Sequence, residues 1–470
     1  MSKVELNQVT NKKMTTEGMR KFGIRDKIGY LLGDFGNDFF FILVSSFLMV
    51  YYTDVFGISA TTVGTLFLIA RLWDAVADVT WGRFIDTRKP SKHGKFKPWI
   101  LRMSFPLVIT GVLMFVHIPG MTDGFYLAYA FVTYIVWGTL YSTVNIPYGS
   151  MASVITSDPV ERTALSTFRT LGATLAGLII NVIGPLIIFV DNQAVASRFT
   201  LAAVLFAILS LACYFSCYKL STERVVSVDK KDSQVNLLTT LKGLTYNKPL
   251  LWILLASLSF MVCSMLMGAV NVYLFKDYFE STTALSLVGL IQTVTIFVAM
   301  PMVKKLVARF GKKEISAAGL LLSAAMYLLL FMMPNLGLTM FIVIMTVGVF
   351  GYSFFNLVIW AFVTDVIDYH EYITGLREDG TVYSIYSFAR KVGQAIAGGV
   401  GGYAIGAVGY NSKIALQSEE TLQGIHTLAT LVPTIIFSIV AIILIFLYPL
   451  NKARTLQLTA DLKQARKTTE

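Results

Sequence analysis

Long apolar stretches recur along this chain, and they constrain its fold more than any other feature. A helix needs about 20 mostly apolar residues to cross the hydrocarbon core of a bilayer. Twelve stretches meet this need, at about 28–52, 59–85, 98–118, 125–150, 165–190, 198–220, 249–275, 284–306, 314–334, 338–366, 381–409 and 421–448. Only 14% of the residues are charged, against roughly a quarter in a soluble domain. The sequence therefore predicts an all-α polytopic membrane protein with 12 transmembrane helices.

The basic residues between these stretches predict how the chain crosses the membrane. The formal net charge is +11, and the basic clusters fall in alternate connections, at 1–27, 86–98, 219–248, 303–313 and the tail from Lys452. The only basic residues in the other connections are Arg198, Lys276 and Lys413. Positive charge marks the cytoplasmic side of a membrane protein, so both termini are predicted to be cytoplasmic and the protein to lie in the cell membrane. Since topology accounts for the basic charge, we expect no nucleic-acid partner.

A polar interruption at 221–248 divides the twelve stretches into two sets of six. This division predicts a cytoplasmic N-terminal segment, a first six-helix bundle, a cytoplasmic linker, a second six-helix bundle and a cytoplasmic tail, at 1–27, 28–220, 221–248, 249–448 and 449–470. A basic, glycine-containing turn follows the second stretch of each set, at 82–100 and 304–315. Parallel repeats of this kind are the pattern of the major facilitator fold.

The second stretch carries three charged residues, Arg71, Asp74 and Asp78, at bilayer depth. Each such residue costs about 2.5–3.5 kcal/mol on insertion scales. Asp74 and Asp78 are four residues apart and share one face of a helix. Two stacked carboxylates in a low dielectric cannot both stay ionised cheaply, so one must take up a proton, gain a cation or pair with Arg71. The stretch therefore predicts a cation or proton site, and a purely structural role in helix contacts is the alternative.

The first stretch contains two aspartates on one helical face, Asp34 and Asp38. Asp34 is close enough to the predicted cytoplasmic end for a structural role. Asp38 lies a turn deeper, so we predict that it belongs to the transport pathway. Arg169 in the fifth stretch and Lys391 in the eleventh carry the opposite charge, which indicates charge balance across the two bundles.

The fourth stretch ends in WGTLYSTVNIPYGSM, in which Tyr141, Ser142 and Asn145 share a face. Tyr and Asn side chains hydrogen-bond hydroxyl groups, and a Ser hydroxyl can offer its oxygen to a cation. Hydrogen bonding between helices explains the same pattern equally well.

An acidic cluster, TDVIDYHEY at 364–372, falls at the predicted cytoplasmic end of the tenth stretch. Its carboxylates Asp365, Asp368 and Glu371, together with Arg162 and the basic connections, predict salt bridges that gate the cytoplasmic side; Arg71 is also assigned to gating. No catalytic constellation or nucleotide-binding loop occurs in a plausible context. We therefore expect no enzymatic activity and no cofactor.

Several motifs, in the same order along nearly the whole chain, resemble one family. They are GDFGNDF (33–39), YYTDVFGIS (51–59), RLWDAVAD (71–78), GKFKPW (94–99), NIPYGSM (145–151), TDVIDYHEY (364–372) and ARKVGQA (389–395). The sequence resembles the glycoside–pentoside–hexuronide:cation symporters, the major facilitator branch that includes melibiose permease. This resemblance implies a cation-coupled sugar importer that works by alternating access.

The cation site that the resemblance implies consists of Asp74, Asp78 and Ser142, which match paired carboxylates and a hydroxyl beside them. Ala77 stands where melibiose permease has an asparagine, and the loss of an amide oxygen favours H⁺ over Na⁺ as the coupling ion. With Na⁺, Asp74 and Asp78 would be metal ligands.

The substrate-binding positions that the resemblance implies are Asp38, Asn37, Tyr141, Asn145, Gly149, Arg169 and Lys391. At the positions of Asn145, Asn37 and Gly149, melibiose permease has an aspartate, a lysine and a tryptophan. The less negative pocket favours a pentoside, such as a xyloside, or a hexuronide over a galactoside. The expected partners are a small-molecule sugar, the coupling cation and the lipid bilayer. A lipid or lysolipid transporter on the same fold is the alternative.

Overall fold

The computed structural model describes residues 20–86, 88, 90–91, 93–156, 158–224, 247–374, 379–411, 414 and 416–469. Within these residues, the first half of the chain forms α2 (Ile24–Val50), the π-helical turn η1 (Tyr51–Val55), α3 (Ala60–Asp86), α4 (Lys97–Leu113), α5 (Asp123–Ile155), α6 (Pro159–Ile188), a short hairpin of β1 (Phe189–Val190) and β2 (Gln193–Ala194), and α7 (Ala196–Leu220). We call these elements the first group.

The second half repeats this order. It forms α9 (Lys248–Tyr273), the π-helical turn η2 (Leu274–Tyr278), α10 (Thr282–Phe310), α11 (Lys312–Met332), α12 (Leu338–Thr374), α13 (Asp379–Ala407), α14 (Glu419–Ile442), η3 (Ile443–Leu447) and α15 (Lys452–Thr469). We call α9–α14 and their π-helical turns the second group. Each of the twelve predicted stretches corresponds to one long helix, and ten of the helices in the described residues are long and apolar enough to span a membrane.

Short polar residues fix where several of these helices begin. Thr122 accepts a hydrogen bond from the Phe125 N–H at the start of α5, and Asn247 accepts one from the Leu250 N–H at the start of α9. Such caps satisfy backbone donors that have no partner inside the helix. The long apolar stretches therefore begin at defined residues.

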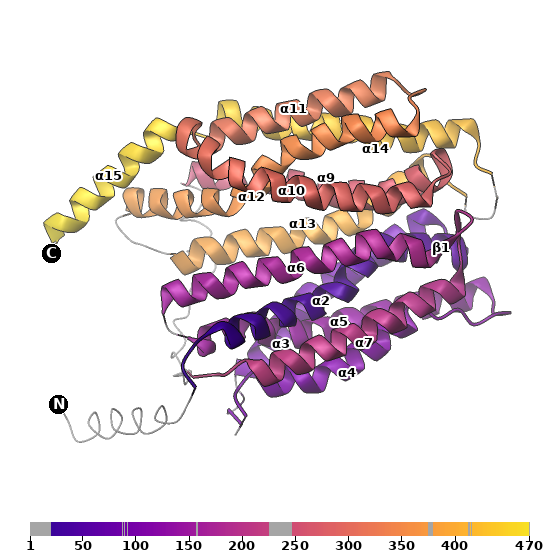
Figure 1. Cartoon of the computed structure of the whole chain (residues 1–470), viewed down its shortest axis with the longest axis horizontal. Coiled ribbons are helices and arrows are strands. Elements are labelled where there is room, and N and C mark those ends of the chain that lie inside the picture. Colours follow the sequence, from indigo (N-terminus) through magenta and orange to yellow (C-terminus); the bar gives the residue numbers. More distant parts are fainter. Residues whose placement is uncertain are drawn as a thin grey trace.

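The helices lie roughly side by side, with the first group along one half of the molecule and the second group along the other (Figure 1). The groups meet where α3 packs on α13, α6 on α10 and α2 on α9. The beginning of α2 and the helix α15 lie at the same end of the molecule, which we call the terminal end (Figure 1). The β1–β2 hairpin lies at the other end, which we call the hairpin end.

The outer faces of the helices are apolar. On α3, Leu72 and Val76 are each 58% exposed, although both lie within the charged second stretch. Exposed apolar surface on this scale fits contact with lipid chains. Arg71 and Asp74 on the same helix have side chains only 12% and 17% exposed. The charged stripe of α3 is therefore turned inward, as the sequence spacing predicted.

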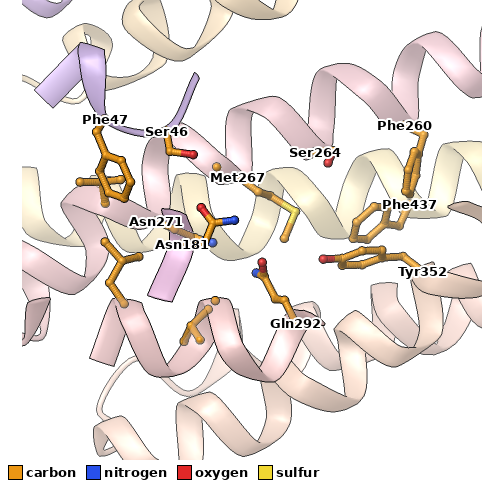
Figure 2. A pocket seen from close by; sticks show the side chains of 15 residues that line it. Ser46, Phe47, Asn181, Phe260, Ser264, Met267, Asn271, Gln292, Tyr352 and Phe437 are labelled. Atoms are coloured by element: carbon orange, nitrogen blue, oxygen red, sulfur yellow. The ribbon is translucent and has the colours of Figure 1, made fainter. Parts of the chain in front are cut away.

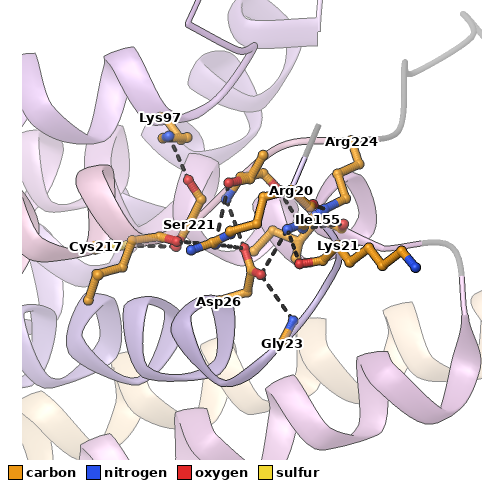
Figure 3. Close-up of polar contacts among 11 residues, drawn as sticks. Arg20, Lys21, Gly23, Asp26, Lys97, Ile155, Cys217, Ser221 and Arg224 are labelled. Carbon is orange, nitrogen blue, oxygen red and sulfur yellow. Dashed lines mark hydrogen bonds and ion pairs between the residues drawn. The ribbon is translucent and has the colours of Figure 1, made fainter. Parts of the chain in front are cut away.

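Two carboxylates, the buried Asp26 and the half-buried Glu223, fasten the first group at the terminal end. Asp26 is fully buried and accepts hydrogen bonds from the guanidinium groups of Arg20 and Arg224, each at 2.8 Å, and from the Thr222 N–H at 3.0 Å (Figure 3). Glu223 accepts hydrogen bonds from the three backbone N–H groups of 95–97. Charge-assisted bonds of this kind are the strong ones.

These contacts correct the start of the predicted linker. Residues 221–224 were predicted to belong to it, but they are packed against the first group because Glu223 and Arg224 bind its backbone and Asp26. Residues 225–246 of the predicted linker lie outside the described residues, and its last two residues, Asn247 and Lys248, cap and begin α9.

The predicted tail contains a helix that was not predicted. In α15, Leu458 and Leu462 are 5% and 7% exposed. The Lys452 ammonium donates to the Arg309 carbonyl at 2.8 Å, and the Lys452 N–H donates to Glu314. The tail therefore packs on the second group from its first residues.

Candidate functional site

The predicted cation residues meet at the contact of α3 with α5. Arg71 and Asp74 form an ion pair, with 3.6 Å between a guanidinium nitrogen and Oδ2. The other carboxylate oxygen of Asp74 lies so close to Gly138 that a Cβ atom there would overlap it. Ser142 is buried and donates to the Gly138 carbonyl at 3.3 Å. The structure thus brings Arg71, Asp74 and Ser142 together around a glycine that was not predicted.

Asp78 lies one turn from Asp74 on α3, toward the terminal end, and is half-buried. Ala77 beside it is 9% exposed and has no oxygen in its side chain. Among the described residues, no group of three or more His, Cys, Asp or Glu side chains is placed to hold a metal ion. In this part of the described structure, the carboxylates available to bind an ion are those of the predicted pair, Asp74 and Asp78.

Arg169 is held by an aspartate that was expected to be structural. Its Nε atom lies 3.0 Å from Oδ1 of Asp34, whose side chain is 8% exposed. The guanidinium also lies 5.4 Å from the ring centre of Tyr148, within the range of a cation–π contact. Tyr148 in turn donates to the Tyr30 carbonyl at 2.7 Å. Asp38, one turn further along α2, is half-buried on the same face.

A single aromatic ring lies between Tyr141, a predicted sugar residue, and Arg71, the ion-pair partner of Asp74. Phe41 lies 5.9 Å from the ring of Tyr141 and 5.5 Å from the guanidinium of Arg71. Tyr141 also packs on Trp137, at 5.4 Å between ring centres. A change in the position of Arg71 therefore reaches Tyr141 through direct contacts.

The other predicted substrate residues differ in their surroundings. Asn145 is half-buried, and Gly149 is exposed, with no atom within 4 Å of a Cβ placed there. Asn37 is 1% exposed and accepts a hydrogen bond from Tyr214 of α7 at 2.7 Å. Asn37 therefore faces the neighbouring helix α7, and a substrate role for it finds no support here. Lys391 lies in α13, but its side chain is outside the described part of the structure.

The two groups touch through backbone where α3 crosses α13. A Cβ atom at Gly402 would lie 2.5 Å from the backbone of Gly64, and one at Gly64 would lie 2.7 Å from the Gly399 carbonyl. Gly398 lies on the same face, with its Cβ position 3.7 Å from Arg71. Small residues allow helices to approach this closely in a membrane.

Charged residues close the hairpin end across the two groups. The ammonium of Lys276 in η2 lies 2.5 Å from Asp54 in η1 and 3.0 Å from Asp277. Tyr410 donates to Asp54 at 2.9 Å. The side chains of Asp54 and Lys276 are 12% and 7% exposed. We call Asp54, Lys276, Asp277 and Tyr410 the hairpin-end cluster.

At the terminal end the predicted gating residues contact their own group. Asp365 pairs with Lys312 at 2.5 Å, and both belong to the second group. Arg162 donates to the carbonyls of Thr156 and Ser153 in the first group. Asp368 and Glu371 follow on α12 and are half-buried. Their predicted role as a gate between the groups stays a prediction.

A cavity of about 140 Å³ lies between the groups and is lined by residues of both (Figure 2). Its polar lining comes from Ser46, Asn181, Ser264, Asn271, Gln292 and Tyr352. Its apolar lining includes Phe260 and Phe437. We call it the amide cavity.

Residues 29–452 match the family described as MFS/sugar transport protein. The chain belongs to this family. A glucuronide carrier protein homolog of Escherichia coli (strain K12) is 34% identical over 445 residues, which cover 94% of this chain and 96% of the relative. An isoprimeverose transporter of Lactiplantibacillus pentosus is 35% identical over 445 residues, with 93% and 91% covered.

The fold agrees with this assignment. The crystal structure of a D-xylose–proton symporter superposes with a TM-score of 0.66 over 91% of this chain and 97% of that one, at 13% identity. The resemblance to the sugar symporter family and the major facilitator fold are thereby confirmed. The protein is a multi-pass membrane transporter and not an enzyme.

Two parts of this transporter were missed from the sequence. Lys276 was noted only as a rare basic residue outside the basic connections, and its partner Asp54 lies 222 residues away. Asn271 and Gln292 are the amides of helices α9 and α10, and each lies in a mostly apolar part of its helix. An isolated amide in an apolar helix is the signal by which the cavity could have been found.

Proposed function

We propose that this transporter is a cation-coupled importer of a glycoside, with H⁺ as the favoured coupling ion and a xyloside or hexuronide as the substrate. The observation that carries the proposal is the chain of contacts from Asp74 through Arg71 and Phe41 to Tyr141. These three contacts connect the proposed ion-binding carboxylate to the ring of a proposed sugar-binding tyrosine. The relatives named for a glucuronide and for isoprimeverose support this substrate class.

Asp74 and Asp78 carry the coupling ion. Without it, two carboxylates beside a single arginine oppose the closure that would bury them more deeply. A bound proton or Na⁺ removes this repulsion, so the ion binds the occluding states more tightly and shifts the population toward them. Ala77 offers no further oxygen, which favours a proton over Na⁺.

The sugar lies on the inner faces of α2, α5 and α6. Asp38, Tyr141 and Asn145 hydrogen-bond its hydroxyl groups, and Arg169 binds either a hydroxyl group or the carboxylate of a hexuronide. With both termini in the cytoplasm, as the basic connections predict, the closed hairpin end is the extracellular end.

Uptake into right-side-out membrane vesicles tests the proposal. Labelled glucuronide and isoprimeverose are supplied under an imposed proton gradient or an imposed Na⁺ gradient. We expect accumulation driven by the proton gradient, with loss of accumulation in Asp74→Asn and in Asp78→Asn. Glu420→Gln, which changes an exposed carboxylate at the start of α14, is the matched control and retains accumulation.

Two outcomes would overturn the proposal. If Asp74→Asn and Asp78→Asn both retain ion-driven accumulation, the assigned cation site is wrong. If the wild type takes up no sugar under either gradient, the protein transports another class of molecule, and uptake of a labelled lysolipid is then the measurement to make.

A further inference from the structure

The amide cavity holds polar side chains that the protein does not use for its own hydrogen bonds. Ser46 comes from α2, Asn181 from α6, Asn271 from α9 and Gln292 from α10, and Figure 2 shows them around one space. Within the described part of the chain, the side chains of these residues form no hydrogen bond, and neither do Ser264 and Tyr352. Asn271 is buried, Ser46, Asn181, Gln292 and Tyr352 are half-buried, and Ser264 is exposed. Polar groups that line a cavity without a partner in the protein are available to a ligand. Six of them around one space therefore indicate a ligand with several hydrogen-bonding atoms.

The chemistry of the lining specifies the ligand. The cavity is lined by amides, hydroxyls and apolar groups, and none of its lining residues is charged. Amides and hydroxyls both donate and accept, so they match the hydroxyl groups of an uncharged sugar ring. Tyr352 lies 6.0 Å from Phe260 and 5.4 Å from Phe437 between ring centres. These rings form an apolar wall that suits the C–H face of a sugar.

The position of the cavity relates it to the predicted sugar residues. Ser46 follows Asp38 by eight residues on α2, which is about 12 Å along a helix. One pyranose ring cannot contact both residues, whereas two linked rings can. The cavity volume of about 140 Å³ far exceeds the 10–15 Å³ or so that one water molecule needs, and it leaves room for one ring.

The two groups both contribute to this cavity at a point where they touch. A Cβ atom at Gly289 would lie 2.7 Å from the Asn181 carbonyl, so α6 and α10 are in backbone contact there. Gln292 follows Gly289 by one helical turn. In this conformation Asn181 and Gln292 therefore present amides from opposite groups, and a ring bound between them contacts both groups.

We propose that the amide cavity binds the second ring of a two-ring glycoside: an uncharged, hydroxyl-bearing ring held by Asn181, Asn271 and Gln292 and packed on Tyr352. This rests on the proposed function, in which the first ring lies at Asp38 and Arg169. The transporter then favours a disaccharide over either free monosaccharide, because only the disaccharide occupies both places.

Transport by cavity variants tests this inference. Asn271→Leu and Gln292→Met keep the side-chain volume and remove the amides. We expect the KM for isoprimeverose, a disaccharide, to rise about tenfold, which corresponds to about 1.4 kcal/mol. The KM for free xylose stays within twofold. Thr293→Val, which removes a hydroxyl bonded within α10, is the matched control and changes neither value. Equal changes for the two sugars would overturn the inference.

A labelling experiment separates this inference from the proposed function. Asn271→Cys introduces a thiol into a chain whose three cysteines are buried. A small methanethiosulfonate reagent should label it, and isoprimeverose but not xylose should slow the labelling at least threefold. Protection from labelling requires only that the sugar binds. It therefore tests the subsite even if no gradient drives uptake. Equal protection by both sugars, or by neither, would overturn the subsite.

Discussion

The two ends of this transporter are held together by different kinds of contact. At the hairpin end, Asp54 of the first group pairs with Lys276 of the second. At the terminal end, Asp26 pairs with Arg20 and Arg224 inside the first group, and Asp365 pairs with Lys312 inside the second. A pair within one group can persist when the groups move as bodies. A pair between groups has to break.

This difference identifies which contacts report the conformational state. The hairpin-end cluster and the glycine contacts of α3 with α13 form only when that end is closed. The pairs of Asp26 and Asp365 stabilise each group in every state. Substitutions at the two ends should therefore change different quantities: the balance of states at the hairpin end, and the stability of one group at the terminal end.

Lys276→Met should have the largest effect. It leaves Asp54 and Asp277 buried without their cation, and breaking a buried pair in this way costs about 3–5 kcal/mol. We expect the closed hairpin end to be lost and uptake to fall by more than a hundredfold. The distance between spin labels at Asp123→Cys and Glu419→Cys, one on each group at this end, should increase.

Lys312→Met is the matched change at the terminal end, because Asp365 is also buried. It should lower the thermal stability while the spin-label distance stays unchanged. A second control combines Lys276→Met with Asp54→Asn, which should recover part of the uptake because it leaves one buried carboxylate fewer. If Lys276→Met and Lys312→Met both shift the label distance equally, the distinction between the ends is wrong.

Gly402→Val should have the next largest effect. Its side chain would meet the backbone of Gly64 at 2.5 Å, and overpacking costs about 1–3 kcal/mol, which is roughly a 5- to 150-fold change in an equilibrium. Uptake should fall toward the upper part of that range, with the same increase in label distance. Gly124→Ala, where a Cβ has no neighbour within 4 Å, should change nothing.

Tyr410→Phe should have the smallest effect. It removes one hydrogen bond to Asp54 and leaves the Lys276 ion pair in place. A hydrogen bond to a charged group contributes about 1.5–3 kcal/mol, but Asp54 also accepts from Thr53 at 2.7 Å, which offsets part of the loss. We expect uptake to fall less than tenfold. A loss as large as that of Lys276→Met would mean that the tyrosine, and not the ion pair, holds the end closed.

The helices were predictable because lipid demands long apolar segments, and these are visible in the sequence without knowledge of tertiary contacts. The approach of Asp74 to Ser142 was implied only by the family resemblance. Its immediate cause, the absence of a side chain at Gly138, involves a residue on another helix. Whether Asn37 faces the pathway or α7 depends on the rotation of α2, which apolar periodicity does not determine in a helix buried on most sides.

The contacts that the sequence did not reveal join residues far apart in the chain. Asp54 and Lys276 are both charged residues near the end of an apolar stretch, where snorkelling to water explains them equally well. Asp26 and Glu223 lie in segments whose composition is that of a linker. In each case the partner, and not the residue itself, distinguishes a buried pair from a solvated charge.

The π-helical turns η1 and η2 end the first helix of each group, and both contain an aspartate followed two residues later by a phenylalanine, in TDVF (53–56) and KDYF (276–279). They therefore occupy pseudo-equivalent positions about the axis that relates the two repeats. Two identical turns facing each other across this axis would bring Asp54 and Asp277 together and repel. Lysine at 276, where the first repeat has Thr53, turns the repulsion into attraction. The closed end is therefore held together at a position where the two repeats differ, with Thr53 in one and Lys276 in the other.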